Sequence, residues 1–221
     1  DLEEKLRHAK EGLEELVEDR TKELRVSETR LFKLLEHSAA DLKAMRRLNE
    51  IGGLCAKDGN DVEACLKEIL SVGIEISGAD KGNIQLTDEE TGALRIAAQS
   101  GFESWFSDFF DLGSDANSAC GVALKSKQRV VVENINESEI FAGKPSLSIL
   151  READVMAVQS LPLVSSTGAV LGIISTHFSN VHRPTEQELR LMDLLARQAA
   201  DYLERKRVEK EREQLLEREH E

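Results

Sequence analysis

Apolar residues recur every three or four positions along residues 1–50, and charged residues fill most of the places between them. Such a narrow apolar stripe with charged flanks is typical of a coiled coil. The step from Leu13 to Val17 shifts the heptad phase, as a stutter does. We therefore predict one long amphipathic helix that pairs with a second helix through Leu2, Leu6, Ala9, Leu13, Val17, Leu24, Leu31, Leu34, Leu42, Met45 and Leu48.

A different pattern begins near residue 48 and predicts a globular domain. Asn60 and Glu63 resemble a capping box, which predicts the start of a helix that ends near residue 77. Short alternating runs then predict strands, and aromatic or small-residue runs predict short helices. The strands are expected at residues 81–87, 94–100 and 129–133, and the short helices at 102–110, 118–126 and 149–154.

Residues 155–178 form two apolar runs on either side of Ser165-Ser166-Thr167-Gly168, and this arrangement predicts a β-hairpin. Strands that are apolar on both faces lie in the middle of a sheet whose two faces are covered. We expect helices over one face and a small pocket over the other. Four polar residues interrupt the runs and are either satisfied core groups or ligand contacts: Gln159, Ser160, Ser175 and His177.

A second long helix is predicted after the hairpin, because Thr185 to Glu188 forms a capping box and apolar residues follow at helical spacing up to Leu203. Leu195, Ala199 and Tyr202 of this helix form an apolar stripe that we expect to be too narrow for a globular core and to pair with a second copy. Beyond Leu203 the sequence is almost entirely charged. The predicted fold is α+β, with a central antiparallel sheet, helices on one face and short helices and loops on the other. We expect three parts: a coiled-coil helix at 1–47, the domain at 48–203 and a charged connector helix at 204–221.

Charge and composition exclude several classes of partner. The net charge is −13 and the pI is near 5.0, which disfavours nucleic acid and anionic membranes. No apolar run approaches the roughly 20 residues of a membrane span, and the first residues form a charged helix in place of a signal peptide. Cys55, Cys65 and Cys120 have no metal-binding spacing, so we expect reduced thiols and a cytoplasmic protein.

The order of these elements resembles a GAF domain, the small-molecule sensor module related to PAS domains, in soluble sensor histidine kinases. The likeness rests on residues 78–86, Ala119-Cys120-Gly121, residues 155–163 and residues 172–178, and it covers about residues 48–203. Residues 18–28 resemble the linker that joins PAS and GAF modules. The resemblance implies a homodimeric regulatory fragment, itself not an enzyme, that relays ligand or redox signals to a kinase core outside this sequence.

The resemblance leaves several roles open for Cys120, which begins a predicted helix. The first alternative is a buried structural thiol. The second is a haem site with Cys120 or His177 as the axial ligand, and the third is the nucleophile of an enzyme similar to free methionine-R-sulfoxide reductases. The reductase alternative lacks resolving cysteines, since Phe110 stands where one is expected. A ligand-free dimerisation spacer is a further alternative. His220 precedes Glu221 as a phosphoacceptor histidine does, but the rest of that motif is not present.

No cofactor is required by these residues, although haem is compatible with them, and no metal-ligand set is present in the sequence pattern. The expected mechanism is ligand occupancy that repacks Phe141, Leu150 and the short helices and so changes the register of the flanking helices. We expect the pocket to be lined by Phe106, Phe109, Cys120, Phe141, Gln159, Ser175 and His177.

Overall fold

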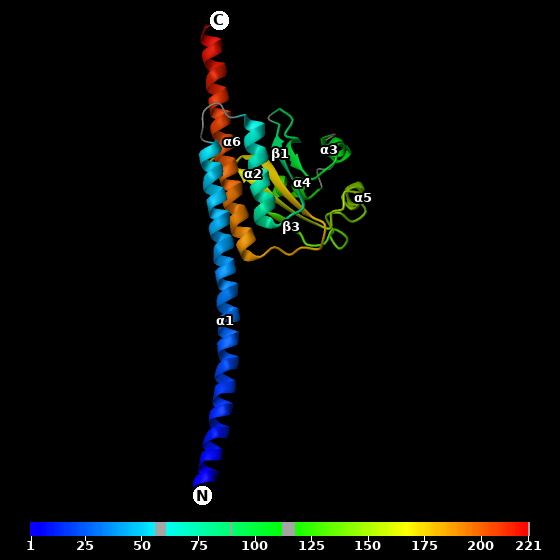
Figure 1. The fold of residues 1–221 in the computed structure, drawn as a ribbon. Coiled ribbons are helices and arrows are strands. Elements are labelled where there is room, and N and C mark those ends of the chain that lie inside the picture. Colours follow the sequence, from blue (N-terminus) through cyan, green and yellow to red (C-terminus); the bar gives the residue numbers. More distant parts are fainter. Residues whose placement is uncertain (56–60, 89, 112–117, 221) are drawn as a thin grey trace. The chain divides into compact units, whose positions relative to one another are not determined.

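The computed structural model of the chain describes residues 1–55, 61–88, 90–111 and 118–220. Five strands form one sheet in the order β2-β1-β5-β4-β3, and every neighbouring pair is antiparallel (Figure 1). The predicted α+β fold is therefore confirmed. The strands are β1 (Lys81–Thr87), β2 (Leu94–Ser100), β3 (Val130–Val132), β4 (Ala157–Val164) and β5 (Val170–Phe178).

Two helices, α2 (Val62–Ser77) and α6 (Glu186–His220), cover one face of the sheet (Figure 1). Gly82 on β1 allows this close approach, because a Cβ atom there would lie 2.9 Å from a methyl carbon of Leu70. The predicted capping box at the start of α6 is confirmed: the Glu188 N–H donates to Thr185 Oγ1, and the Thr185 N–H donates to the Glu188 carboxylate. The N-cap of α2 is Asp61, which accepts from the Glu63 N–H, whereas the predicted cap Asn60 lies outside the described residues.

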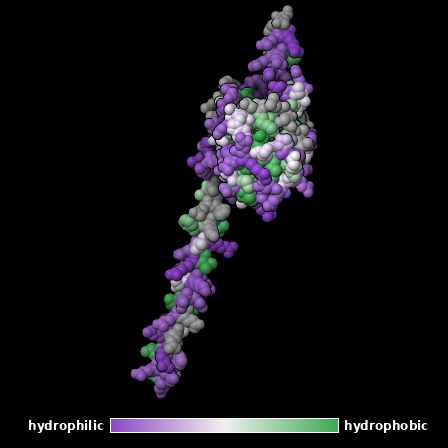
Figure 2. Space-filling model, turned by 90° about the vertical axis from the view of Figure 1, so that its right-hand side faces the viewer, coloured by the Kyte–Doolittle hydropathy of each residue, from purple (hydrophilic) through white to green (hydrophobic). Residues whose placement is uncertain are grey.

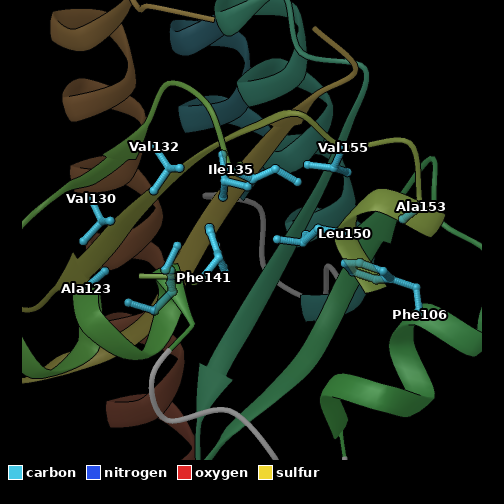
Figure 3. Packing of buried hydrophobic residues seen from close by; sticks show 12 residues of the cluster. Phe106, Ala123, Val130, Val132, Ile135, Phe141, Leu150, Ala153 and Val155 are labelled. Atoms are coloured by element: carbon cyan, nitrogen blue, oxygen red, sulfur yellow. The ribbon is translucent and has the colours of Figure 1, made fainter. Parts of the chain in front are cut away.

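Three short helices cover the other face: α3 (Ser104–Asp111), α4 (Ala119–Ser126) and α5 (Pro145–Glu152) (Figure 1). Their buried side chains form a second hydrophobic core with the strands beneath them. Figure 3 shows this core, in which α3 contributes Phe106, α5 contributes Leu150, and the segment before α5 contributes Phe141. Figure 2 views this side of the domain and shows apolar side chains in the middle of the face, surrounded by hydrophilic ones.

The chain forms two compact units, and helix α1 (Leu2–Cys55) contributes residues to both, because the boundary between the units follows Met45. In the first unit, Asp1–Met45, the described apolar side chains are exposed, and Leu24 and Leu31 have exposed fractions of 62% and 56%. In the second unit the stripe becomes part of a core, because Leu48 and Ile51 are buried. Arg47 is bound there by Glu50, Glu68 and Glu75, with N–O distances of 2.9, 3.9 and 3.4 Å.

Two sequence predictions are wrong in this structure. Leu195, Ala199 and Tyr202 were predicted to form a seam too narrow for a globular core, but they are buried within the domain on α6. Their stripe packs on the chain's own sheet and is not available for a second copy. Cys65 is disulfide-bonded, so the expectation of three reduced thiols does not hold, and a disulfide gives no support to a reducing cytoplasm.

Neither a membrane span nor a metal site is found among the described residues. No described helix combines the length and apolar character that crossing a bilayer requires. In the same part of the chain, no group of three or more His, Cys, Asp and Glu side chains is arranged to hold a metal ion.

Candidate functional site

A small cavity lies between the sheet and the short helices α3, α4 and α5. Its floor comes from β1, β4 and β5, and its cover comes from the aromatic and aliphatic residues above them. The cavity measures about 20 Å³, which is room for about one water molecule. The lining residues are Asn83, Gln85, Phe106, Phe110, Ser118, Ala119, Cys120, Phe141, Leu150, Val158, Ser160, Ser175 and His177.

The floor of the cavity is polar because strand alternation points every second residue of β1 and β5 toward it. Asn83 pairs with Ser175 across these strands, and the hydroxyls of Ser160 and Ser175 are hydrogen-bonded at 2.8 Å. Three buried atoms of the floor have no hydrogen-bond partner in the structure: Asn83 Oδ1, Gln85 Oε1 and His177 Nδ1. Buried polar atoms are nearly always satisfied, so this face carries unused hydrogen-bonding capacity.

His177 is neutral in the folded protein. Burial and, to a smaller extent, the nearby Lys81 ammonium lower its pKa from 6.5 to about 3. The side chain is held between rings, since the Phe102 ring meets it edge-on with 4.9 Å between centroids and Phe106 lies at 6.2 Å. The Lys81 ammonium donates to the Ala153 carbonyl. A neutral imidazole can donate from one nitrogen and accept at the other.

The cover of the cavity is apolar. Phe106 stacks on Phe102 with 3.8 Å between ring centroids, and Phe110 packs against Phe106 at 4.8 Å. Phe141 and Leu150 are buried beside them. These side chains come from α3, from the segment before α5 and from α5 (Figure 3), so an occupant larger than a water molecule must displace several elements at once.

Cys120 lies in the first turn of α4, at the edge of the cavity. Ser118 is the N-cap residue of this helix: its side chain accepts from the Gly121 N–H and lies 2.9 Å from the Cys120 sulfur. The Cys120 side chain is half-buried. No second cysteine is found among the described lining residues.

The structure brings together five of the seven side chains that the sequence suggested: Phe106, Cys120, Phe141, Ser175 and His177. Two others lie elsewhere. Gln159 pairs with Thr176, whereas its neighbour Ser160 pairs with Ser175, so Gln159 points to the opposite face. Phe109 is not a lining residue, and Phe110, whose ring it meets edge-on, takes that place. The His220 side chain lies outside the part of the chain that is described.

Sequence reasoning missed the two amides on the floor. Asn83 and Gln85 are alternate residues of a buried strand, flanked by Ile84 and Leu86, and this polar alternation was the signal that pointed to one common face. The hydroxyl of Ser160 was recognised as a polar exception in its strand but was not placed among the expected pocket residues.

The cavity does not fit a haem. Although Cys120 and His177 line the same cavity, its volume of about 20 Å³ is far below the roughly 300–1,000 Å³ of pockets that hold drug-sized ligands. Phe106 and Phe102 also occupy the space beside the His177 ring. We therefore assign no haem to these residues.

The family model described as GAF domain matches residues 59–204 of the chain. The chain belongs to the GAF domain family. The expected resemblance is thus confirmed, and the cavity lies within the matched residues. A comparison with curated proteins gave no match.

Several solved GAF-like structures share the fold. A domain assigned to a two-component sensor histidine kinase protein of Sinorhizobium meliloti is 24% identical, with a TM-score of 0.59 over 71% of this chain and 99% of that one. The GAF domain of a phosphoenolpyruvate-protein phosphotransferase from Coxiella burnetii is 18% identical, with a TM-score of 0.63 over 76% and 97%. Free methionine-R-sulfoxide reductase from Neisseria meningitidis, solved with its substrate, is 18% identical, with a TM-score of 0.57 over 74% and 90%.

Proposed function

We propose that this GAF domain is the sensory module of a cytoplasmic two-component sensor histidine kinase. It binds a small molecule in the cavity and relays occupancy to a kinase core through the helices on either side. The observation that carries the proposal is the cavity itself, in which unpartnered polar atoms of the floor face an apolar cover. The likeness to the Sinorhizobium domain supports the kinase setting.

The β4–β5 hairpin provides a direct route from the cavity to α6. Ser160, Ser175 and His177 stand on the strands of this hairpin, and its turn is bound to the helix. The Ser166 N–H and hydroxyl both donate to the Glu204 carboxylate, at 3.1 and 2.8 Å. Glu204 directly follows Leu203, the last buried residue of α6. A displaced hairpin therefore acts on α6 at the point where the helix leaves the domain.

The proposed signalling unit is a parallel homodimer held by the exposed stripe of residues 1–45. Apolar side chains such as Leu24 and Leu31 are more than half exposed there, and each buried leucine contributes roughly 1.5–3 kcal/mol. Several such contacts per chain outweigh the association cost of about 4–15 kcal/mol. The connector after Leu203 contributes Val208, Leu215 and Leu216, which are also exposed.

The relay can be tested with two matched substitutions in α4. Ala119 lines the cavity, whereas Ala123, one turn further along, is buried in the same core without lining it. We expect Ala119→Leu to fill the cavity as an occupant would and to change the distance between the two α6 helices of a dimer. Ala123→Leu should leave that distance unchanged.

The distance is measured by pulsed electron resonance, with the spin label on a noncanonical amino acid in place of Glu213 so that the native cysteines remain. Circular dichroism checks that both variants keep their fold. An unchanged distance in Ala119→Leu contradicts the relay and favours a ligand-free spacer. If no distance between two spin labels can be measured in the wild-type background, the dimer is contradicted.

A further inference from the structure

The side chains of the cavity define the chemistry of its ligand more narrowly than the fold does, and the inference that follows rests on the proposed function of this cavity as the ligand site. Asn83 and Gln85 are two residues apart on β1 and share the floor. Two residues of a strand span roughly 7 Å. Both present an unpartnered carboxamide oxygen, so the floor offers two hydrogen-bond acceptors whose backbone positions have that spacing.

The described side chains of the cavity carry no charge that would compensate a charged ligand. None of the described lining residues is an Asp, Glu, Lys or Arg, and His177 is neutral. A cation would meet no carboxylate and would lie near the Lys81 ammonium. An anion would meet the two unpartnered carboxamide oxygens, while the Lys81 ammonium, which is not a lining residue, already donates to the Ala153 carbonyl. Burying an uncompensated charge is costly, so the site discriminates by charge.

The apolar half of the ligand is defined by the cover. Phe106, Phe110 and Phe141 lie opposite the polar floor, and aromatic side chains pack well against a flat ring. A ring-sized molecule exceeds the present volume of about 20 Å³, so its entry moves α3. Trp105, the single tryptophan of the chain, lies on α3 with its ring 6.1 Å from that of Phe106 and reports this movement.

We propose that the cavity binds an uncharged, single-ring molecule that carries hydrogen-bond donors at two ends about 7 Å apart, and that it rejects carboxylates, phosphates and ammonium ions. The donors bind the oxygens of Asn83 and Gln85, and the ring packs under the phenylalanines. His177 supplies a third hydrogen-bonding group, which is neutral. It pairs with Lys81 of β1 and therefore lies beyond Asn83 on the side away from Gln85.

Three compounds of one shape test the proposal: 4-aminobenzamide, which is uncharged with donors at both ends, 4-aminobenzoate, which is an anion, and 4-aminobenzamidine, which is a cation. Each is titrated into the full chain while Trp105 fluorescence and the unfolding temperature are followed. We expect 4-aminobenzamide to raise the unfolding temperature and to bind at least about tenfold more tightly than either charged compound. Equal or tighter binding of a charged compound, or no response to 4-aminobenzamide at millimolar concentration, overturns the proposal.

Two buried glutamines provide a matched pair of variants. Gln85 faces the cavity, whereas Gln159 is equally buried, has unpartnered amide atoms and faces the helices. Gln85→Leu should weaken 4-aminobenzamide about tenfold, the effect of losing one hydrogen bond, without lowering the unfolding temperature. Gln159→Leu should keep the affinity. Asn83→Leu repeats the test at the second acceptor.

Equal affinity in Gln85→Leu and the wild type contradicts the assigned floor contacts, as does an equal loss in Gln159→Leu. These results are separable from the relay, because the spin-label experiment on Ala119→Leu needs no ligand. A changed α6 distance together with a preference for a charged compound would refute the ligand class and leave the sensory role in place. The reverse pattern would refute the relay alone.

Discussion

Replacing His177 should remove a defined part of the pH dependence of folding. The folded-state pKa of His177 is about 3, against 6.5 for an unperturbed histidine, and burial is the main cause. Between these two values the unfolded chain binds a proton that the folded domain does not. The stability associated with neutral His177 is therefore fully present above pH 6.5 and is lost as the pH falls toward about 3.

The magnitude follows from the two pKa values. Lowering the pH from neutrality to about 5 should cost about 2 kcal/mol of the free energy of unfolding through this one group. His177→Phe removes the titration and keeps an aromatic ring beside Phe102 and Phe106. The variant should therefore lose about 2 kcal/mol less than the wild type over the same interval.

Urea unfolding at a series of pH values, followed by far-ultraviolet circular dichroism at fixed protein concentration, measures this difference. His8→Gln is the control, because His8 is exposed on α1 outside the folded domain. His182 stacks on Phe178 and remains in all three proteins, so its contribution cancels. An identical pH dependence in His177→Phe and the wild type would refute the assignment of a buried, neutral His177.

Three further predictions concern the parts of the molecule that surround the cavity. Gly172→Ala should lower the unfolding free energy by about 3 kcal/mol, because its Cβ would lie 2.4 Å from a backbone oxygen of β1. Gly53→Ala should raise it by roughly 0.5–1 kcal/mol, because a Cβ there would meet no atom within 4 Å. Calorimetry compares the two variants with the wild type. Leu31→Glu should convert a particle of twice 24.6 kDa into a monomer with an unchanged dichroism spectrum, and a monomeric wild type in light scattering would contradict the dimer. Ser166→Ala should raise the pKa of Glu204, which hydrogen bonds from the Ser166 backbone and hydroxyl now lower, and NMR titration of the carboxyl carbon measures the shift.

The sequence was informative where a pattern depends on neighbours along the chain. Two apolar runs and the turn between them at residues 165–168 predicted the hairpin, and the capping box predicted the start of α6. The cluster of aromatic residues before residue 111 placed Phe106 near the cavity, and the helix start placed Cys120 there. Each of these features is set by local backbone geometry, which a single sequence contains.

The errors arose where pairing between distant strands decides the outcome. Gln159 and Ser160 are adjacent, and only the register with β5 shows that Ser160, not Gln159, shares a face with Ser175. Asn83 joins the same floor because β1 pairs with β5, more than 80 residues later in the chain. Leu195 belongs to a stripe that would suit either a coiled coil or the face of a sheet, and packing against α2 and β4 decides between them.

The small volume of the cavity, about 20 Å³, limits how much signal the domain can transmit. A ring-sized ligand must displace Phe106 or Phe141, so part of its binding free energy is used to move the cover. The apparent affinity equals the affinity of the open domain multiplied by the fraction of domains that are open before the ligand binds. The binding free energy used to move the cover is also the free energy available to shift the hairpin and, through Ser166 and Glu204, helix α6, since a ligand transmits only its difference in affinity between two states. A substitution that opens the cover in advance and keeps the phenylalanines that pack on the ring, such as Leu150→Ala, should therefore tighten binding of 4-aminobenzamide while reducing the change in the α6 distance that the ligand produces. Weaker binding together with an undiminished change in distance would show that the cover and the helix are not coupled.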